Sequence, residues 1–532
     1  MTTLLHGSDT LTRDALTVLQ PGFVGTTAPD WLLRRIGEGL SSVGLFGRNV
    51  VSPEQLARLT AQLRAERDDV LVAIDEEGGD VTRLEVNDGS SFPGNYALGR
   101  VDDVELTRAV ARELGRRLID CGIDLNWAPS ADVNSNAENP VIGVRSFGPD
   151  PDLVARHTVA YVDGLQAVGV AACTKHFPGH GDTNVDSHDA LPRIDVDLAT
   201  LHARELVPFR AAIAAGTKAV MSAHILLPAL DTDRPATLSP QILTGLLRQE
   251  LGFDGLIVTD GMEMQAVAAT YGIERGSVLA IAAGADAICV GGGLCDEDTV
   301  LRLRDALVEA VRTGELPEER LADAAARVRA LAAWTQAHRA RGAGSVPGAA
   351  VQEGTAPGAD VGLVAARRAL RITKGAELYT PVSSAPFVAS FTPVANFAVG
   401  DETPWGVAAE LDRLLPGTES GSFDAEATVE SVLAAAGERR IVAVVRDLHR
   451  HPWMTAALDG LVAVRPDTVV VEMGLNEAEP RGALHIATHG AARVCGRAAA
   501  EAVVGTGACR PEKHTIGGGG ARGAEGGGGG AG

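Results

Sequence analysis

Residues 175–183 form the part of the chain that is richest in side chains able to do chemistry. They read Lys-His-Phe-Pro-Gly-His-Gly-Asp-Thr, and Asp186, Ser187 and His188 follow at once. The segment comes directly after the apolar run 168–173, which is typical of a buried strand. In a parallel α/β protein, substrates meet the chain where such strands end. A purely structural cluster would need a buried partner for each ionisable group, so the pattern favours a functional site.

Polar or charged side chains also end other predicted strands. The positions are Asp75, Asn126 with Trp127, Lys175 with His176, and Asp260. At the carboxyl ends of barrel strands these side chains would converge on one mouth. Any one of them could instead belong to a structural ion pair, but several together indicate a site.

Asp260 follows the apolar residues 256–258 and stands in the motif Thr-Asp-Gly-Met-Glu-Met. A carboxylate placed directly after a strand is held rigidly, as a nucleophile for covalent catalysis requires. The alternative is that Asp260 caps the N-terminus of a helix, a role that Asp often fills. The motif by itself leaves both interpretations open.

Short apolar runs alternate with helical patterns from the N-terminus to about residue 335. Helical spacing is clear in 104–119, for example. The predicted strands are 43–46, 70–75, 123–128, 168–175, 219–223, 256–260 and 287–290. Repeated strand–helix units predict a parallel sheet with right-handed crossovers. We therefore expect an α/β fold, a (β/α)8 (TIM-like) barrel, with a doubly wound open sheet as the competing architecture.

The 532 residues exceed one ordinary core, so a second domain is expected. We predict a catalytic barrel domain at 1–336, a linker rich in Gly, Ala, Pro and Ser at 337–360, and a small α/β sandwich domain at 361–510. In that domain, strands are predicted at 441–445 and 468–472 and a helical pattern at 425–436. The Gly-rich tail 511–532 cannot form a core and is expected to be disordered.

Composition excludes several kinds of partner. Lys and Arg number 47 against 69 Asp and Glu, a net charge of −22, which disfavours nucleic acid and anionic membranes. No apolar run is long enough to span a bilayer, and no basic segment precedes an apolar core at the start, so neither a membrane anchor nor a signal peptide is expected. The six scattered cysteines suit reduced thiols, and a cytoplasmic location is predicted.

With these motifs in view, the chain resembles the family-3 glycoside hydrolases of the β-N-acetylglucosaminidase (NagZ-type) branch. Matching motifs occur in family order over roughly residues 15–335. They are Asp75–Gly79 (Asp-Glu-Glu-Gly-Gly), Asn126–Asn134 (Asn-Trp-Ala-Pro-Ser-Ala-Asp-Val-Asn), Asn139–Gly148 (Asn-Pro-Val-Ile-Gly-Val-Arg-Ser-Phe-Gly), Lys175–Thr183 with Asp186–His188, and Thr259–Met264. One such motif would be weak evidence, but five in order are specific. The resemblance implies a barrel enzyme that cleaves glycosides with retention.

By this resemblance, Asp260 would attack the anomeric carbon, and His188, polarised by Asp186, would protonate the leaving oxygen and later activate the acceptor. The general retaining scheme uses two carboxyl groups. An imidazole titrates near neutrality, and a neighbouring carboxylate favours its acidic form, which accounts for the departure. The resemblance implies no cofactor and no metal.

The family's sugar-binding positions correspond to Asp75, Arg83, Arg145, Lys175 and His176. Asp75 can accept hydrogen bonds from hydroxyls, and the other four can donate them. For Arg83, an ion pair with a carboxylate such as Glu76 is an equally open interpretation. The chain departs from the family at Asp80, where Arg is usual, which puts a local ion pair in doubt. 

The leading hypothesis is an exo-β-N-acetylglucosaminidase acting on a small carbohydrate substrate, either cell-wall fragments or chitooligosaccharides. Phosphorolysis at the same site is the close alternative, because a histidine does not repel phosphate as a carboxylate would. A non-catalytic sugar-binding protein and a metalloenzyme with ligands His176, His180, Asp182 and His188 are weaker alternatives. Residues 361–506 are expected to stabilise the protein or pair subunits, as a monomer or homodimer, and to supply no catalytic group.

Overall fold

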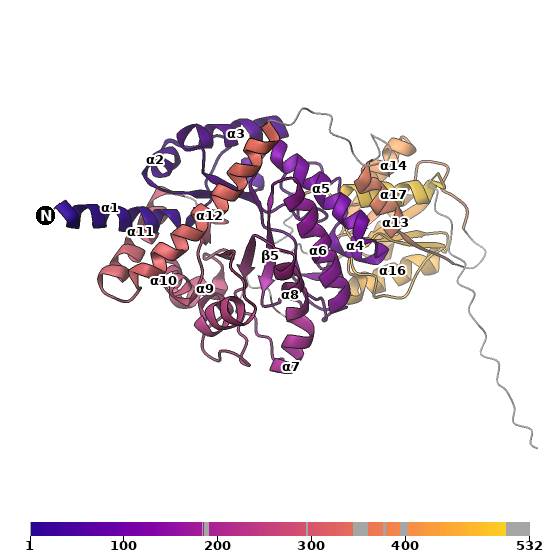
Figure 1. Ribbon diagram of the computed structural model, residues 1–532. Helices are drawn as coiled ribbons and strands as arrows, with labels where there is room; N and C mark the ends of the chain where they lie inside the picture. The colour runs from indigo at the N-terminus through magenta and orange to yellow at the C-terminus, as the bar shows by residue number, and fades with distance from the viewer. Residues whose placement is uncertain are drawn as a thin grey trace, which may run out of the picture.

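The structure is a computed structural model that describes residues 2–183, 185, 191–293, 296–343, 360–375, 379–393 and 403–506. Two α/β units are visible in Figure 1, a larger one coloured indigo to salmon and a smaller one coloured orange to yellow. The predicted tail 511–532 and the predicted site residues Asp186 and His188 lie outside the described residues. Within the described part of the chain, none of the helices has both the length and the apolar character that a membrane span requires.

Parallel strands form the centre of the larger unit. They are β1 (Leu19–Pro21), β2 (Ser42–Leu45), β3 (Leu71–Ile74), β4 (Leu125–Asn126), β5 (Ala171–Phe177), β6 (Ala219–Ser222), β7 (Leu256–Thr259) and β8 (Ile288–Val290). Strands β2 to β7 lie side by side in chain order, and β8 pairs with β1. A bridge between Val258 and Ala287 joins β7 to the approach of β8. This order has no reversal, so the (β/α)8 barrel is confirmed and the open doubly wound sheet was the wrong alternative.

Successive side chains of these strands point alternately into the barrel and outward to the helices. The interior holds mostly small and medium apolar side chains: Leu71, Ala73, Leu125, Trp127, Ala171, Cys173, Ala219, Met221, Leu256 and Val258. Val328 and Leu331 of helix α12 (Glu318–Ala343) pack into the same cluster. The outward side chains, such as Val72 and Ile74, join the core between the strands and the surrounding helices. The barrel is therefore a filled core that leaves its mouth for polar groups.

Helices surround the barrel. They are α1 (Thr2–Thr17), α2 (Asp30–Glu38), α3 (Pro53–Glu66), α4 (Asn95–Val101), α5 (Val104–Asp120), α6 (Pro151–Ala167), α7 (Leu198–Thr200), α8 (Leu206–Ala214), α9 (Gln265–Tyr271), α10 (Ile273–Ala283) and α11 (Glu297–Arg312), with π-helical turns at Leu201–Glu205 and Gln241–Glu250. Helix α5 is typical: the Asp103 side chain caps it by accepting from the N–H groups of Glu105 and Leu106, and its apolar face is buried.

The smaller unit is a sheet between two helix layers. Its strands are β9 (Arg371–Lys374), β10 (Phe387–Phe391), β11 (Glu419–Phe423), β12 (Ile441–Val445), β13 (Val469–Glu472) and β14 (Leu484–Ala487). Their order is β11-β10-β12-β13-β14-β9, and only the β9 pairing is antiparallel. One face packs on α13 (Val361–Ala369), α14 (Ala408–Leu414) and α17 (Arg493–Val504), the other on α15 (Val429–Ala436) and α16 (Pro452–Val464). This is the predicted α/β sandwich. Helix α12 continues to Ala343 and so enters the expected linker 337–360.

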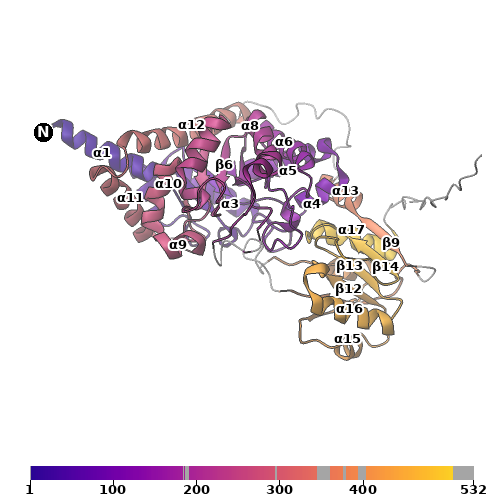
Figure 2. The ribbon, with the colours of Figure 1, turned by 90° about the horizontal axis from the view of Figure 1, so that it is seen from below.

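The smaller unit lies against one side of the barrel, where α13 contacts α4 and α5 (Figure 2). The doubt about Asp80 is resolved at this interface. Its carboxylate pairs with Arg446 of the smaller unit at 2.5 Å and accepts the backbone N–H of Ala491 at 2.7 Å. Burial raises the pKa of Asp80, although Arg446 opposes that rise. The acidic residue that departs from the family pattern therefore has an ion-pair partner in the second unit.

Candidate active site

Strand alternation explains why particular polar side chains face the barrel mouth. Leu71 and Ala73 point inward, so Asp75, two residues further, has the same direction. Lys175 follows Ala171 and Cys173 in the same way, and Asp260 follows Leu256 and Val258. In each case an apolar strand fills the barrel, and the first polar residue of the same alternation stands at its carboxyl end. Three predicted site residues are thereby directed to one mouth.

Lys175 is a deeply buried charge of the site, with 2% of its side chain exposed. Its ammonium donates to Oδ1 of Asp75 at 2.6 Å and lies 2.6 Å from Oε1 of Glu77. Burial opposes the charged form, but the two carboxylates outweigh it and raise the pKa of Lys175. Lys175 is thus a fixed cation that orients Asp75, whose side chain remains 21% exposed.

Glu77 connects this pair to Arg145. Nε and Nη2 of Arg145 donate to the two carboxylate oxygens of Glu77 at 3.0 and 2.6 Å, a bidentate pair with 5% and 3% of the side chains exposed. Burial would raise the pKa of Glu77, but Arg145 and Lys175 together lower it. Sequence reasoning did not single out Glu77. Its position two residues after Asp75 was a signal, since both follow the same strand.

His176 is held by a carboxylate behind it. Its Nδ1 lies 2.7 Å from Oδ2 of Asp132, whose Oδ1 accepts the backbone N–H groups of His176 at 3.2 Å and His180 at 2.7 Å. Burial would raise the pKa of Asp132, but His176 lowers it. Nε2 of His176 lies 3.3 Å from Nη2 of Arg145. Asp132 is a second residue that sequence reasoning missed, although it lies within the quoted motif 126–134.

Arg83 stands at the edge of the cluster. Its guanidinium lies 3.6 Å from Oδ2 of Asp75. Glu76, the alternative partner, accepts the backbone N–H groups of Arg83 and Leu84 and the hydroxyl of Thr82. Burial raises the pKa of Glu76 to about 7, against those hydrogen bonds. The structure thus brings Asp75, Arg83, Arg145, Lys175 and His176 together, and their role in binding a sugar stays a prediction.

Asp260 comes directly after β7. Its backbone N–H donates to the carbonyl of Ser222 at 3.2 Å, and its Oδ1 accepts the N–H of Gly261 at 2.8 Å. The next helix, α9, begins only at Gln265 with Met264 as its N-cap, so Asp260 is not a helix cap. The carboxylate therefore stands at the mouth directly after its strand, and its role as a nucleophile stays a prediction.

The other two predicted catalytic residues, Asp186 and His188, lie outside the described residues. The segment leading to them is anchored: Nδ2 of Asn139 donates to the carbonyl of His180 at 2.9 Å and to the hydroxyl of Thr183 at 3.2 Å. The described residues contain no cluster of side chains able to hold a metal ion. Asp182 faces Arg204 at 2.7 Å instead, and burial lowers the pKa of His180 to about 4.

The mouth of this (β/α)8 barrel holds a carboxylate after β7 together with fixed cations and hydrogen-bond acceptors. Such a mouth is suited to an enzyme that binds a polar substrate. Comparison with known proteins identifies the class of enzyme. Residues 34–331 match the model of the glycosyl hydrolase family 3 N-terminal domain. The chain belongs to glycosyl hydrolase family 3 and is a glycoside hydrolase.

Relatives of this chain carry hexosaminidase names. It is 36% identical over 329 residues to Beta-hexosaminidase A of Pseudoalteromonas piscicida, covering 57% of this chain and 55% of that protein. It is 37% identical over 265 residues to a Beta-hexosaminidase of Neisseria meningitidis serogroup C, covering 48% and 73%. Among solved structures, a family 3 β-N-acetylglucosaminidase from a Paenibacillus species matches with a TM-score of 0.80 and 32% identity over 93% of this chain and 97% of that one. The chain therefore spans little more than half of the first of these relatives.

Proposed function

We propose that the protein is a retaining exo-β-N-acetylglucosaminidase that removes terminal non-reducing N-acetylglucosamine. The observation that carries the proposal is the convergence of Asp75, Lys175 and Asp260 on the barrel mouth. The hexosaminidase names of its relatives support the choice of sugar. Cell-wall fragments or chitooligosaccharides are the substrates that fit such an activity.

In the proposed binding mode, the paired side chains hold the non-reducing sugar. Asp75, oriented by Lys175 and Arg83, accepts hydrogen bonds from sugar hydroxyls through its exposed edge. Arg145 and His176, fixed by carboxylates behind them, act as donors. Because their partners already set these side chains in place, little conformational entropy is lost on binding.

The proposed reaction proceeds in two displacements. In the first, an oxygen of Asp260 attacks the anomeric carbon, the glycosidic bond breaks, and the imidazolium of His188 gives its proton to the leaving oxygen. In the second, the neutral His188 takes a proton from water, the resulting hydroxide attacks the anomeric carbon, and the bond to Asp260 breaks. Asp186 would stabilise the charged imidazole.

Phosphorolysis would use the same residues with phosphate in place of water. The hexosaminidase names of the relatives favour hydrolysis. We further propose that the smaller unit, which contains strands β9 to β14, supplies no catalytic group. We also propose that the protein acts as a monomer or homodimer. Replacing acidic residues at 361–506 should therefore leave turnover intact wherever folding is intact.

The test is turnover of 4-nitrophenyl N-acetyl-β-D-glucosaminide with and without phosphate, with Asp260→Ala as the comparison. Free N-acetylglucosamine at a rate that phosphate does not change would support the hydrolase. A phosphate-dependent rate that yields N-acetylglucosamine 1-phosphate would replace it with a phosphorylase. Full activity of Asp260→Ala would contradict the site. Absence of turnover by the wild-type chain would also contradict it, and would favour the alternative of a non-catalytic sugar-binding protein.

A further inference from the structure

The peptide group that follows Asp260 sets the orientation of its carboxylate. The backbone N–H of Gly261 donates to Oδ1 of Asp260 at 2.8 Å. A hydrogen bond from a fixed donor to one carboxylate oxygen holds the group in one orientation, and the other oxygen is then the one that attacks. Once that oxygen carries a sugar, Oδ1 is the carbonyl oxygen of an ester, and the same N–H polarises it. Whatever holds Gly261 therefore acts on both proposed displacements.

His224 holds Gly261 from the neighbouring strand. It stands two residues after the end of β6, which pairs with β7, and its side chain is buried. Its Nε2 lies 2.9 Å from the carbonyl oxygen of Gly261. A carbonyl oxygen can only accept, so Nε2 carries the proton at this contact. The imidazole thus pins the peptide whose N–H side faces the nucleophile.

The ring of His224 is itself fixed on its other side. Its Nδ1 lies 2.9 Å from Oγ1 of the buried Thr237. The same hydroxyl donates to the carbonyl of Ala223 at 2.9 Å and lies 2.9 Å from the hydroxyl of Ser222. The carbonyl of Ser222 in turn accepts the backbone N–H of Asp260 at 3.2 Å. The ends of β6 and β7 are thereby joined by one buried network, which leaves the imidazole a single position.

The chain after the nucleophile has other supports that do not involve His224. The N–H of Met262 donates to the carbonyl of Cys289 in β8 at 3.0 Å. The N–H of Met264 donates to the carbonyl of Gly261 at 3.0 Å. Without the imidazole, the segment would therefore stay in place and Gly261 would keep one donor on its carbonyl. The expected loss is in the orientation of one peptide, and the fold should survive it.

The sugar-binding cluster lies on other strands. Asp75, Lys175 and His176 come from the ends of β3 and β5, whereas His224 follows β6 and bonds to the segment after β7. A change at His224 should therefore affect the rate of reaction more than the affinity for the sugar.

We propose that His224 is a positioning residue for the reaction, which acts through the peptide of Gly261 to fix the attacking orientation of the Asp260 carboxylate. The proposal rests on the proposed function and adds to it a residue outside the motifs that carry the family resemblance. The role requires the hydrogen-bond donor on Nε2 and the hydroxyl of Thr237 that orients the ring.

The test uses three variants and one matched control. His224→Phe keeps a ring but removes the donor, His224→Gln keeps an N–H near the position of Nε2, and Thr237→Val removes the hydroxyl without changing the shape. His157→Phe is the control, because His157 is also buried and its Nδ1 also lies 2.9 Å from a threonine hydroxyl, that of Thr107, but between helices α5 and α6. We measure kcat and KM for 4-nitrophenyl N-acetyl-β-D-glucosaminide, the inhibition constant of N-acetylglucosamine, and thermal unfolding.

We expect His224→Phe to lower kcat roughly ten- to a hundredfold, the range of one hydrogen bond in a site that carries charge. The inhibition constant of N-acetylglucosamine should stay within about twofold, since the sugar-binding side chains are unchanged. His224→Gln should recover part of the rate, and Thr237→Val should lower kcat by a smaller factor than His224→Phe. His157→Phe should reduce thermal stability and leave kcat unchanged.

Full kcat in His224→Phe would overturn the positioning role while the hydrolase stands. So would a loss of kcat matched by an equal loss of affinity for N-acetylglucosamine, because that result indicates a general distortion of the site. If His224→Phe does not fold, the other two variants decide, and unchanged kcat in both would overturn the proposal. A wild-type chain without turnover would overturn the proposed function, and the positioning role with it.

Discussion

Glu77→Gln is expected to weaken both the fold and sugar binding, because Glu77 is the carboxylate shared by Arg145 and Lys175. The substitution keeps the shape but removes the charge from three contacts of 3.0, 2.6 and 2.6 Å. Removing one partner from a buried ion pair costs about 3–5 kcal/mol, because the charges left behind are neither hydrated nor paired. The free energy of unfolding should fall by about that amount.

The assay is denaturant unfolding of the full chain, followed by fluorescence at several pH values. Glu113→Gln is the matched control: Glu113 also faces two arginines, Arg116 and Arg117, but on the surface of α5. The Glu113→Gln substitution should lower the free energy of unfolding by less than about 1 kcal/mol. The Glu77 carboxyl has a pKa below its ordinary 4.5 in the folded state. Its contribution is therefore full above about pH 5 and is lost as the pH falls through the folded-state pKa.

A second readout is the affinity for N-acetylglucosamine, measured by calorimetry. If the displaced Arg145 and Lys175 side chains reduce the binding free energy by about 1.4 kcal/mol, the affinity for the sugar falls tenfold. Glu113→Gln should leave this affinity unchanged. If Glu77→Gln were as stable as the wild type within about 1 kcal/mol and bound the sugar equally well, the account of Glu77 as the centre of the cluster would be refuted.

Three further predictions follow from the site. Asp132→Asn should lower kcat/KM roughly tenfold, at 1.4 kcal/mol per factor of ten, because it removes the charge that orients His176; equal kinetics would contradict this. Gly181→Ala should cost at least about 1–3 kcal/mol of unfolding free energy, because its Cβ would lie 1.7 Å from the carbonyl of Val133, whereas Gly293→Ala has open space and should be neutral by the same assay. Turnover should survive dialysis against a chelator, and loss that zinc restores would revive the metalloenzyme alternative.

The barrel was predictable because its strands are short apolar runs with polar ends. Six of the seven predicted barrel strands overlap sheet strands β2 to β7, and the seventh overlaps β8. β1 was missed because Leu19–Pro21 is only three residues long and offers no periodicity. In the second unit, β12 and β13 are central and apolar and were predicted, whereas the edge strands β9 and β11 carry exposed polar residues that look like loop.

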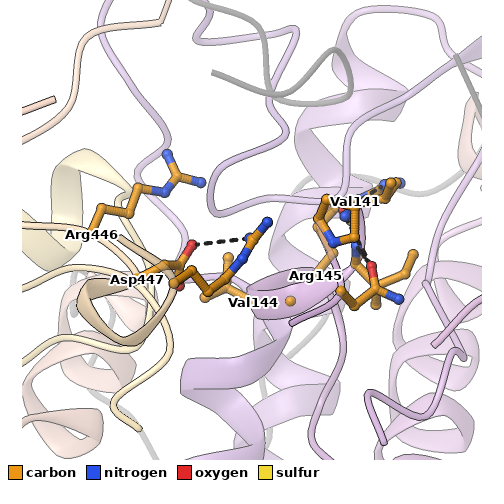
Figure 3. A pocket seen from close by; sticks show the side chains of 10 residues that line it. Val141, Val144, Arg145, Arg446 and Asp447 are labelled. Carbon is orange, nitrogen blue, oxygen red and sulfur yellow. Dashed lines mark hydrogen bonds and ion pairs between the residues drawn. The ribbon is translucent and has the colours of Figure 1, made fainter. Parts of the chain in front are cut away.

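The site was predictable where the chain itself brings residues together. Lys175 and His176 follow one strand, and the direction of Asp75 and Asp260 follows from strand alternation. Partners remote in sequence could not be found in this way. Asp80 and Arg446 are 366 positions apart, and neither sequence segment contains a pattern that predicts the other as its partner. A small pocket between the barrel and the second unit (Figure 3) depends on the same long-range packing.

The most direct test of the account is to identify the residue that carries the glycosyl-enzyme intermediate. A 5-fluoro N-acetyl-β-glucosaminyl fluoride has a good leaving group but forms an intermediate that hydrolyses slowly, so the adduct can be digested and sequenced by mass spectrometry. The account predicts one sugar per chain, attached to Asp260, and no adduct on Asp260→Ala. An adduct on another residue, or steady turnover with no covalent adduct at all, would contradict it.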